Sequence, residues 1–595
     1  MKNIKKDISK ITEKEKLTAL DSVSIKRFEN MEELRAELKK YEENSSKDLA
    51  FNEESIVQDE AKEASSESRS TDYSKTNNQV ESVDEADIVK TDGNYIYYSK
   101  NNRVYIVDQD LNLKATIKEK NFCASQIFVN GDKLIVFGSE NSIYQTKTVT
   151  IDSVMKENIS SYNKPKTYAR VYNIKDIENP ELVREIAVDG YYQDARMIDD
   201  DIYFITNYSI YFYKPLEELK DEEILPSFRD SSISEETKSI SVDKIAHFED
   251  TTNYQYSLIS GFNLNSNDEV NVETFFGFGS ELYVSENNMY IICTKYSNLY
   301  DLKSYSTIYK FKLENSSIIA VASCEVDGNI NNQFSLDEYN GNLRVATTIF
   351  HSYYNEENEY MSEYYTRLTI FDENLEKIGG IDNLIDGEKI YAVRFIGTVG
   401  YIVTFEQVDP LWVIDLSDPT KPVVKGELEI PGYSSYLHPY DETHIIGIGY
   451  DVKSNGYGGV TNDTLKLSMF DVSDLENPKE LFKINFNQKN AYSNIMYEHK
   501  ALFFNKNANL IGFPISTYNY RKNESGILLY RVDLENNKFE EITSLVENVG
   551  NYAERSIYIG ENIYVLYNNL IVKYDLNTFE KKNSLKLETD YIGDN

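Results

Sequence analysis

Short runs of apolar residues alternate with polar turns over most of the chain, and this alternation repeats. Residues 125–138 (SQIFVNGDKLIVFG), 195–207 (ARMIDDDIYFITN) and 393–405 (VRFIGTVGYIVTF) each hold two apolar runs joined by a turn with Gly, Asp or Asn. Such pairs, rich in Ile, Val and Tyr, predict β-hairpins. A third run that closes on a polar residue follows, as in 411–416 (LWVIDL), and a fourth comes after a Pro-containing turn, as in 417–430.

The repeated unit is therefore predicted to be four antiparallel strands, recurring roughly every 40 to 60 residues, which is typical of β-propeller blades. We expect an all-β protein in which residues 83–595 form one large β-propeller of roughly eight or nine blades. Nine candidate units are present, beginning near Asp87, Ser125, Ala195, Ser280, Gln333, Tyr391, Tyr436, Ser493 and Tyr552.

Two segments precede the repeats. Residues 1–44 contain one predicted helix, which Asn30 can cap, with Glu33 three residues later as in a capping box. Residues 45–82 are rich in Ser, Glu, Asp and Asn and poor in apolar residues. Such a segment buries too little surface to offset the entropy lost on ordering, so we expect a disordered linker.

Charge and composition narrow the possible partners. The 595 residues include 62 Lys and Arg against 99 Asp and Glu, a net charge of −37. A surface this acidic repels phosphate backbones and anionic lipids, so we expect no nucleic-acid partner. We expect no membrane insertion by this chain, because no run of about 18 apolar residues occurs. The sequence start lacks the apolar region of a signal peptide, and the three cysteines form no CxxC pair.

Seven stretches carry a resemblance to a known family. They are residues 83–97, 189–198, 333–348, 387–405, 409–422, 431–449 and 466–474. Taken in order, they resemble a family of secreted bacterial and archaeal proteins with a C-terminal β-propeller domain, distantly related to WD40 propellers. The resemblance implies a propeller held outside the membrane, generally without an assigned activity. The hydrophobic anchor that the family places upstream is not found in this sequence.

The letters DEAD at residues 84–87 precede the first unit and allow three interpretations. An ATPase also requires a phosphate-binding GxxxxGK[ST] loop, which the chain lacks. A standard calcium loop requires oxygen ligands at alternating positions, which the spacing here does not supply, although a non-standard ion site stays open. We favour an architectural role, in which the carboxylates lie near the central channel and pair with arginines of other blades.

Arginines for this pairing occur in several units. Arg196 and Arg394 hold the same place on the innermost strands of their units, Arg344 lies on a second strand, and Arg555 opens the last unit. We expect Arg196 and Arg394 to pair with the carboxylates of 84–87. The alternative is a ligand site at the channel mouth, where guanidinium groups bind an anionic group bidentately. Its members are Arg196, Arg344, Arg394, Asp84, Glu85 and Asp87.

Catalytic motifs are not evident in the chain. The five histidines form no HExxH motif, no GxSxG elbow is present, and carboxylates are too numerous to single out a glycosidase pair. We therefore name no catalytic residue and expect no cofactor. A structural calcium ion, and with it a metal-stabilised propeller, is a weaker alternative.

These observations favour a non-enzymatic, monomeric recognition scaffold, placed outside the cell or on its surface by the family resemblance. We expect it to bind a protein, peptide or glycan through loops at one face of the propeller. The loops are expected at the insertions 139–165, 214–250, 351–366 and 451–463. The alternative is a hydrolase that acts on polysaccharide or peptide at the mouth of the central channel.

Overall fold

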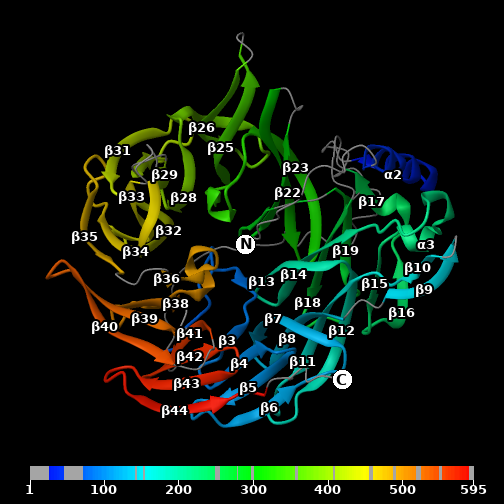
Figure 1. The fold of residues 1–595 in the computed structure, drawn as a ribbon, viewed down its shortest axis with the longest axis horizontal. Helices are drawn as coiled ribbons and strands as arrows, with labels where there is room; N and C mark the ends of the chain where they lie inside the picture. Colours follow the sequence, from blue (N-terminus) through cyan, green and yellow to red (C-terminus); the bar gives the residue numbers. More distant parts are fainter. Residues whose placement is uncertain are drawn as a thin grey trace, which may run out of the picture.

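The computed structural model describes residues 26–45 and 72–588, with short gaps at 141–143, 152–153, 248–254, 278, 280, 297–300, 356–358, 406–408, 455–459, 487–490, 518–523 and 548–551. The strands in this part form nine consecutive four-stranded antiparallel units around a common centre (Figure 1). The chain is a β-propeller, as the repeat predicts. Within each unit the later strands lie farther from the centre.

The first five units follow the chain order. Unit 1 comprises β3 (Val89–Thr91), β4 (Tyr95–Lys100), β5 (Arg103–Asp108) and β6 (Leu113–Ile117). Unit 2 comprises β7 (Phe122–Asn130), β8 (Lys133–Glu140), β11 (Lys166–Asn173) and β12 (Glu181–Asp189). Unit 3 comprises β13 (Tyr191–Ile198), β14 (Asp201–Ser209), β18 (Gln255–Asn263) and β19 (Asn271–Phe276). Unit 4 comprises β20 (Glu281–Val284), β21 (Asn288–Tyr296), β22 (Asp301–Glu314) and β23 (Ser317–Asp327), and unit 5 comprises β24 (Leu336–Tyr339), β25 (Asn342–Tyr354), β26 (Tyr360–Phe371) and β27 (Lys377–Asp386).

The last four units repeat the same order. Unit 6 comprises β28 (Lys389–Ile396), β29 (Val399–Phe405), β30 (Asp409–Asp415) and β31 (Val423–Ile430). Unit 7 comprises β32 (Tyr433–Asp441), β33 (His444–Ser454), β34 (Val460–Asp471) and β35 (Lys479–Asn485). Unit 8 comprises β37 (Phe503–Asn505), β38 (Leu510–Thr517), β39 (Glu524–Asp533) and β40 (Lys538–Glu547), and unit 9 comprises β41 (Ala553–Ile559), β42 (Asn562–Tyr567), β43 (Leu570–Asp575) and β44 (Lys581–Lys586).

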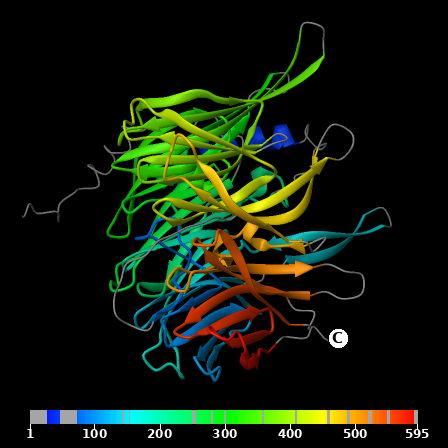
Figure 2. The same cartoon turned by 90° about the vertical axis from the view of Figure 1, so that its left-hand side faces the viewer.

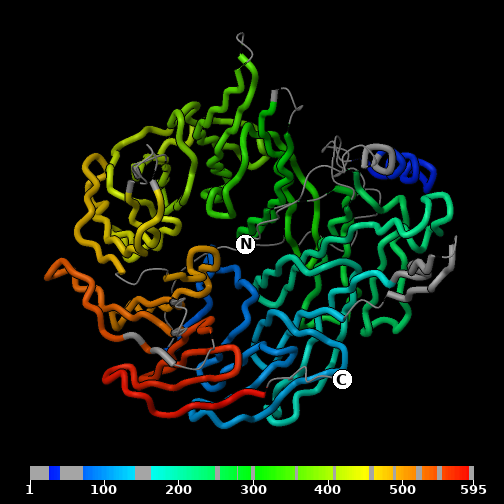
Figure 3. Tube along the Cα trace, viewed as in Figure 1, coloured from blue at the N-terminus to red at the C-terminus, as the bar shows by residue number. Residues whose placement is uncertain are grey.

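Apolar clusters join each unit to the next and close the ring. The side chains on the two faces of each sheet pack against the neighbouring sheets, and Ile, Val, Leu and Tyr dominate these contacts. One cluster joins the first unit to the last, because Val89 and Ile96 pack with Ile559 and Leu566. Figure 3 shows the blue trace of the first unit beside the red trace of the last.

The four insertions expected to be loops contain regular structure. Each connects the second strand of a unit to the third. In unit 2 the insertion forms the hairpin β9 (Tyr144–Ile151) and β10 (Val154–Tyr162), and in units 5 and 7 it extends the strand pairs β25–β26 and β33–β34. Continuing an antiparallel ladder pairs the backbone groups of a polar segment, so these hairpins need little apolar surface. Figure 2 shows the long hairpins projecting from one side.

The insertion of unit 3 is the largest and forms a small layer of its own. Its elements are η1 (Leu216–Glu218), α3 (Asp221–Ile224), β15 (Ser227–Asp230), β16 (Ser234–Ser239), η2 (Val242–Lys244) and β17 (Ile245–His247). The expected N-terminal helix, α2 (Met31–Ser45), lies against this layer (Figure 1). Its buried Leu34 and Leu38 pack there, and β1 (Lys26–Arg27) pairs with β17.

The predicted cap of α2 is present, because the Glu33 backbone N–H donates to Asn30 Oδ1 at 3.0 Å. Among the described helices, none has the length and apolar character needed to cross a membrane.

Residues 72–82, which we expected to belong to the linker, instead lie inside the propeller. Together with residues 83–88 they form a central segment that passes several units before unit 1 begins. The Ser74 N–H donates to Tyr558 O in unit 9 at 2.9 Å. Asn77 donates to His499 O at 3.1 Å, and Gln79 donates to Gln333 O at 3.1 Å. Polar side chains that bond to backbone carbonyls help to order this segment, and the apolar side chains of Tyr73 and Val83 pack into the clusters between units. Residues 46–71 of the expected linker lie outside the described part.

Candidate functional site

The central segment brings its carboxylates to the middle of the ring. Asp84 and Glu85 form β2 (Asp84–Glu85), which pairs with β13 so that Glu85 stands opposite Arg196. Glu85 is 1% exposed, and its Oε1 accepts a hydrogen bond from the Gln79 N–H at 2.9 Å. Its Oε2 lies 3.9 Å from Arg196 Nη2 and 3.6 Å from His499 Nε2. Burial raises the pKa of Glu85 above its ordinary value, against the opposing effect of Arg196.

Asp87 makes the cross-unit ion pair that the sequence suggests, with a different arginine. Arg555 on β41 donates from Nη2 to Asp87 Oδ1 at 2.9 Å and from Nε to both carboxylate oxygens. Both side chains are buried. Asp84 pairs with Lys90 of β3 at 2.7 Å, and among the described residues no arginine forms an ion pair with it. Of the two expected partners, Arg196 lies 3.9 Å from Glu85, whereas Asp87 and Asp84 pair instead with Arg555 and Lys90.

Arg196 and Arg394 hold equivalent places, as expected, but only Arg196 is paired. Arg196 stands opposite Tyr203 and Arg394 opposite Tyr401, each on the innermost strand. Arg196 Nη1 lies 2.5 Å from Asp194 Oδ2 on its own strand.

Arg394 is bound by none of the carboxylates of 84–87, so the expected pairing is wrong for this residue. Its Nε and Nη2 atoms are buried without a hydrogen-bond partner in the described part of the chain. The central segment explains the difference, because it directs its carboxylates to units 1, 3 and 9. To units 5, 7 and 8 it presents the amide side chains of Asn77 and Gln79.

Arg344 lies apart from this group. Its guanidinium binds Asp337 on the neighbouring strand β24 and donates from Nη1 to Gly397 O at 2.6 Å. It also lies over the rings of Tyr339 and Phe395, at 4.8 and 5.0 Å from their centroids. Arg344 thus joins unit 5 to the first turn of unit 6.

Three central residues were missed in the sequence. Gln333 in η3 (Gln333–Ser335) accepts from Arg196 Nη2 at 2.9 Å, and Lys500 in η5 (His499–Ala501) donates to Ala86 O at 3.2 Å. His499 is 2% exposed, and burial, followed by the nearby cations, lowers its pKa well below the ordinary value. In units 5 and 8 the first strand is short, and the 3-10 turns η3 and η5 precede it and carry these residues. A shortened apolar run at the start of a unit is therefore the sequence feature that could have indicated them.

The charged residues at the centre of the ring, most of them buried, contact one another. We call them the central cluster: Asp84, Glu85, Asp87, Arg196, His499, Lys500 and Arg555. Asp87 and Arg555 are paired and buried, and Glu85 is closed off from solvent. Among the described residues, no three His, Cys, Asp or Glu side chains gather closely enough to hold a metal ion. A nucleophile, general acid or electrophile needs access to a substrate, and these side chains have almost none.

In contrast to the buried centre, one face of the ring carries exposed side chains. We call it the connection face. Successive strands of a unit run antiparallel, so the connections from strand 2 to strand 3, and from strand 4 to the next unit, emerge at the same end. The long hairpins all belong to this end. The tight turns between strands 1 and 2 and between strands 3 and 4 lie at the other end, the turn face.

Exposed tyrosines gather on the connection face. Every strongly exposed aromatic side chain of the described residues stands at the start of a first or third strand, near the end of a second strand, or in the segment that leads into unit 8. These residues are Tyr191, Tyr211, Tyr296, Tyr354, Tyr360, Tyr492, Tyr497 and Tyr552. Tyr354 and Tyr360 are 55% and 60% exposed, with ring centroids 5.7 Å apart in an edge-to-face arrangement. At the starts of fourth strands, on the turn face, the exposed residues are aliphatic, as in Val423.

A second group of aromatic rings extends this surface across units 6 to 8. Tyr433 contacts Tyr391, Phe405 and Tyr450, with ring centroids 4.7, 5.1 and 6.0 Å away. Burial, with contributions from Tyr391, Tyr450 and Tyr497, raises the pKa of Tyr433 to about 12. Beside this group the ring of Tyr497 stacks on that of Tyr492, with centroids 6.1 Å apart.

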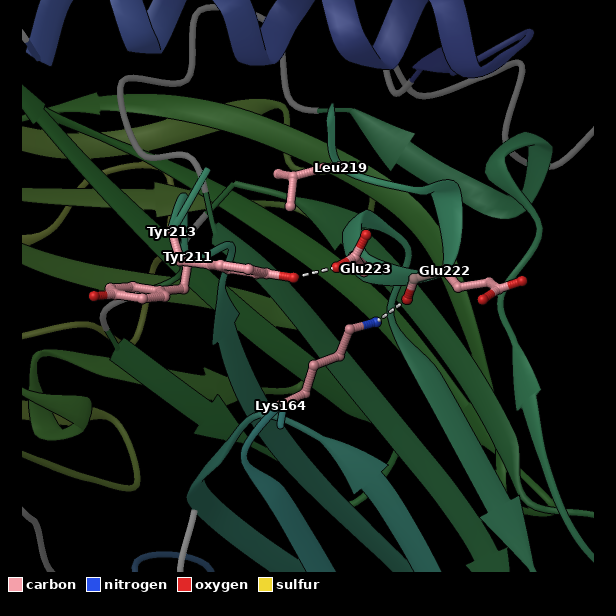
Figure 4. Close-up of a pocket in the computed structure, with 6 residues that line it drawn as sticks. All are labelled: Lys164, Tyr211, Tyr213, Leu219, Glu222 and Glu223. Carbon is pink, nitrogen blue, oxygen red and sulfur yellow. Dashed lines mark hydrogen bonds between the residues drawn. The ribbon is translucent and has the colours of Figure 1, made fainter. Parts of the chain in front are cut away.

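A small polar pocket of about 250 Å³ lies beside the unit 3 insertion (Figure 4). It is lined by Lys164, Tyr211, Tyr213, Leu219, Glu222 and Glu223. Lys164 Nζ donates to Glu222 O at 2.7 Å, and Tyr213 donates to the Glu223 carboxylate. Burial lowers the pKa of Lys164, although the nearby Asp189 opposes this effect. These hydrogen bonds between lining residues join Lys164 to the unit 3 insertion and hold the insertion in place.

The chain is similar to several known proteins. The chain is 28% identical over 599 residues to an uncharacterized protein of Archaeoglobus fulgidus, covering 87% of this chain and 85% of that protein. It is 29% identical over 477 residues to an uncharacterized protein of Methanocaldococcus jannaschii, covering 70% of each. The solved structure of apo AztD from Citrobacter koseri aligns over 85% of this chain and 95% of that one, at 10% identity and a TM-score of 0.30. A family model described as a β-propeller domain matches residues 73–579, and the chain belongs to that family.

Proposed function

We propose that this protein is a non-enzymatic recognition scaffold that binds its partner through the connection face. The observation that carries the proposal is the gathering of the exposed tyrosines on that face. Tyrosine supplies a large, rigid contact area at low entropic cost together with a hydroxyl for hydrogen bonding, and it is enriched where proteins bind one another. The rigid ring below holds these side chains in fixed positions, as recognition requires.

The chemistry of the surface favours a protein or peptide partner of opposite charge. The net charge of −37 attracts basic partners at long range and repels acidic ones. Tyrosine rings also stack on sugar rings, so glycans belong in the same test. Placement outside the cell or at its surface is part of this proposal and is supported by the family resemblance; labelling of intact cells with a membrane-impermeant reagent tests it.

The central cluster weighs against the hydrolase alternative. A hydrolytic site at the channel mouth requires accessible carboxylates with strongly shifted pKa values. Asp84 is paired with Lys90, and Asp87 is buried against Arg555. Glu85 has the shifted pKa but is 1% exposed.

The test screens a glycan array and a displayed peptide library with the wild-type chain and with matched double variants. Tyr354→Ser/Tyr360→Ser and Tyr492→Ser/Tyr497→Ser alter the connection face, and Val423→Ser/Val424→Ser alters exposed residues of the turn face. We expect selected ligands to bind at least about tenfold more weakly to one or both tyrosine variants and normally to the valine variant. Ligands that bind all variants equally, or an absence of ligands from both libraries, would overturn the proposal.

A further inference from the structure

Arg394 is a buried cation without the partner that the other central cations have. It is 2% exposed, and its Nε and Nη2 atoms have no hydrogen-bond partner in the described part of the chain. Its guanidinium carbon lies 5.3 Å from the centroid of the Phe334 ring. That ring offers a face to the cation but no negative charge.

The neighbouring cations each have a carboxylate partner. Arg196 is bound by Asp194, Arg555 by Asp87, and Lys500 Nζ lies 3.9 Å from Glu498 Oε1. Removing an ion from water without a counter-charge costs several kcal/mol, roughly, even after the protein relaxes. Burial lowers the pKa of Arg394 to about 9, which leaves the guanidinium protonated at neutral pH. The charge therefore has to be balanced by something other than a described side chain.

A second unsatisfied group also neighbours Phe334. His499 is 2% exposed, and neither of its ring nitrogens has a hydrogen-bond partner in the described residues. Its ring centroid is 6.2 Å from that of Phe334, and the centroid of Tyr436 is 6.1 Å from the same ring. Phe334 thus has Arg394, His499 and Tyr436 as common neighbours.

The carboxylates nearby are already engaged or held back from ionising. Asp87 and Asp194 belong to Arg555 and Arg196. Glu498 Oε1 lies 4.0 Å from His499 Nδ1, but this carboxylate also pairs with Arg555 and Lys500. Glu85, 3.6 Å from His499 Nε2, is the remaining candidate, and burial raises its pKa. Glu85 Oε2 lies beside Arg196 and His499, and among the described residues no carboxylate forms an ion pair with Arg394.

We propose that Arg394 and His499 form an internal binding site for one small monovalent anion, of the size of a halide or a formate ion. The guanidinium donates Nε–H and Nη2–H to the anion as a fork, a geometry that favours anionic ligands. An N–H of the His499 imidazole donates from a second direction. The bound ion supplies the negative charge that the central segment does not bring to unit 6, and so stabilises the middle of the ring.

The test uses the full chain and varies the anion at constant sodium concentration. Sodium screens the self-repulsion of an acidic protein equally in every salt, so a difference between chloride and the bulky gluconate reports the anion itself. We expect the melting temperature to be higher in chloride than in gluconate, by about 2 °C or more, and to saturate as chloride is raised. Bromide should replace chloride and give an anomalous-scattering peak next to Arg394 in crystals of the wild-type protein. Formate in place of chloride shows whether a carboxylate is also accepted.

Two variants complete the test. Arg394→Met should abolish the chloride–gluconate difference and melt no lower than the wild type in gluconate, since it removes the unbalanced charge. Arg344→Met, which removes an equally buried arginine that has a carboxylate partner, should retain the difference. The salt comparison and the bromide experiment on the wild-type protein need no variant, and together they decide the question even if Arg394→Met does not fold. Equal melting in all salts, with or without a bromide peak, would overturn the proposal, because a peak without a stability effect marks an adventitious ion only.

Discussion

Arg555 and Asp87 join the last unit of the ring to the segment that opens the first, across 468 positions of sequence. The arginine donates two nitrogens to the carboxylate and also lies 3.0 Å from Glu498. Both side chains of the pair are buried. A buried ion pair at the centre of the ring therefore joins its two ends, in addition to the apolar cluster between units 1 and 9.

We expect Arg555→Met to lower the free energy of unfolding by about 3–5 kcal/mol, because it leaves Asp87 as an unpaired buried charge. Adding Asp87→Leu to that variant should recover much of the loss. Lys312→Met serves as the control, since the exposed pair of Lys312 with Glu314 contributes at most about 1 kcal/mol. Asp87→Leu alone completes the cycle. Thermal unfolding of the wild type and the four variants measures the coupling; strictly additive losses would show that the pair does not act as a unit.

The acid stability of the protein should depend on His499. Its folded pKa is well below 6.5, so below about pH 6.5 the unfolded chain binds a proton that the folded chain does not. Stability contributed by a neutral His499 is therefore lost as the pH falls through this window, by at most about 1.4 kcal/mol per pH unit. We expect His499→Phe to lose less stability than the wild type between pH 7 and pH 5.5.

Glu85 should show the opposite sign, because its folded pKa is raised. Its stabilising contribution is present below about pH 4.5 and is lost as the pH rises through the folded pKa. The free energy of unfolding of Glu85→Gln should therefore fall less than that of the wild type as the pH rises above about 4.5. Melting temperatures of both variants that follow the wild type in parallel at every pH would refute this assignment.

The packing of the central segment against unit 1 can be tested at one glycine. Gly93 has φ +85°, and a Cβ on it would lie 2.7 Å from the Tyr73 ring. Gly387 has φ +84° with nothing within 4 Å, so it reports backbone strain alone. We expect Gly93→Ala to cost more than Gly387→Ala, which itself costs roughly 1–3 kcal/mol. Combining Gly93→Ala with Tyr73→Ala should remove most of the additional loss of unfolding free energy that Gly93→Ala shows over Gly387→Ala. Equal losses at the two glycines, measured by thermal unfolding, would show that Tyr73 does not pack against Gly93.

Helix α2 should detach locally when its apolar face is lost. Leu34 and Leu38 are fully buried on the unit 3 insertion, whereas Lys39 is exposed. We expect Leu34→Ala/Leu38→Ala to speed hydrogen exchange in residues 31–40 at least about tenfold while exchange in unit 6 stays unchanged. Lys39→Ala provides the control. Unchanged exchange in the helix would mean that the apolar contacts do not hold it.

The sequence predicts strands, turns and the repeat because these depend on neighbouring residues. Alternation of apolar and polar positions and turns such as Asp92–Gly93 set the hairpins, and the Asn30 cap sets the start of α2. The equivalence of Arg196 and Arg394 follows from the same local register.

The partners across the ring do not follow from local pattern. Which carboxylate meets which arginine depends on the path of residues 72–88 through the centre, and that path is fixed by hydrogen bonds from Asn77 and Gln79 to distant carbonyls. The polar composition of residues 72–82 led us to expect a linker. Composition alone does not show whether a polar side chain bonds to water or to another unit of the ring. His499 and Gln333 were missed for the same reason.

The most direct test of recognition through the connection face is a hydrogen-exchange footprint of the wild-type chain with its tightest library ligand. The proposed function predicts protection at the ends of β25 and β26, around Tyr354 and Tyr360, or at residues 491–497, with β13 and β28 in the channel unaffected. Protection confined to the channel strands or to the turn face around Val423 would contradict it.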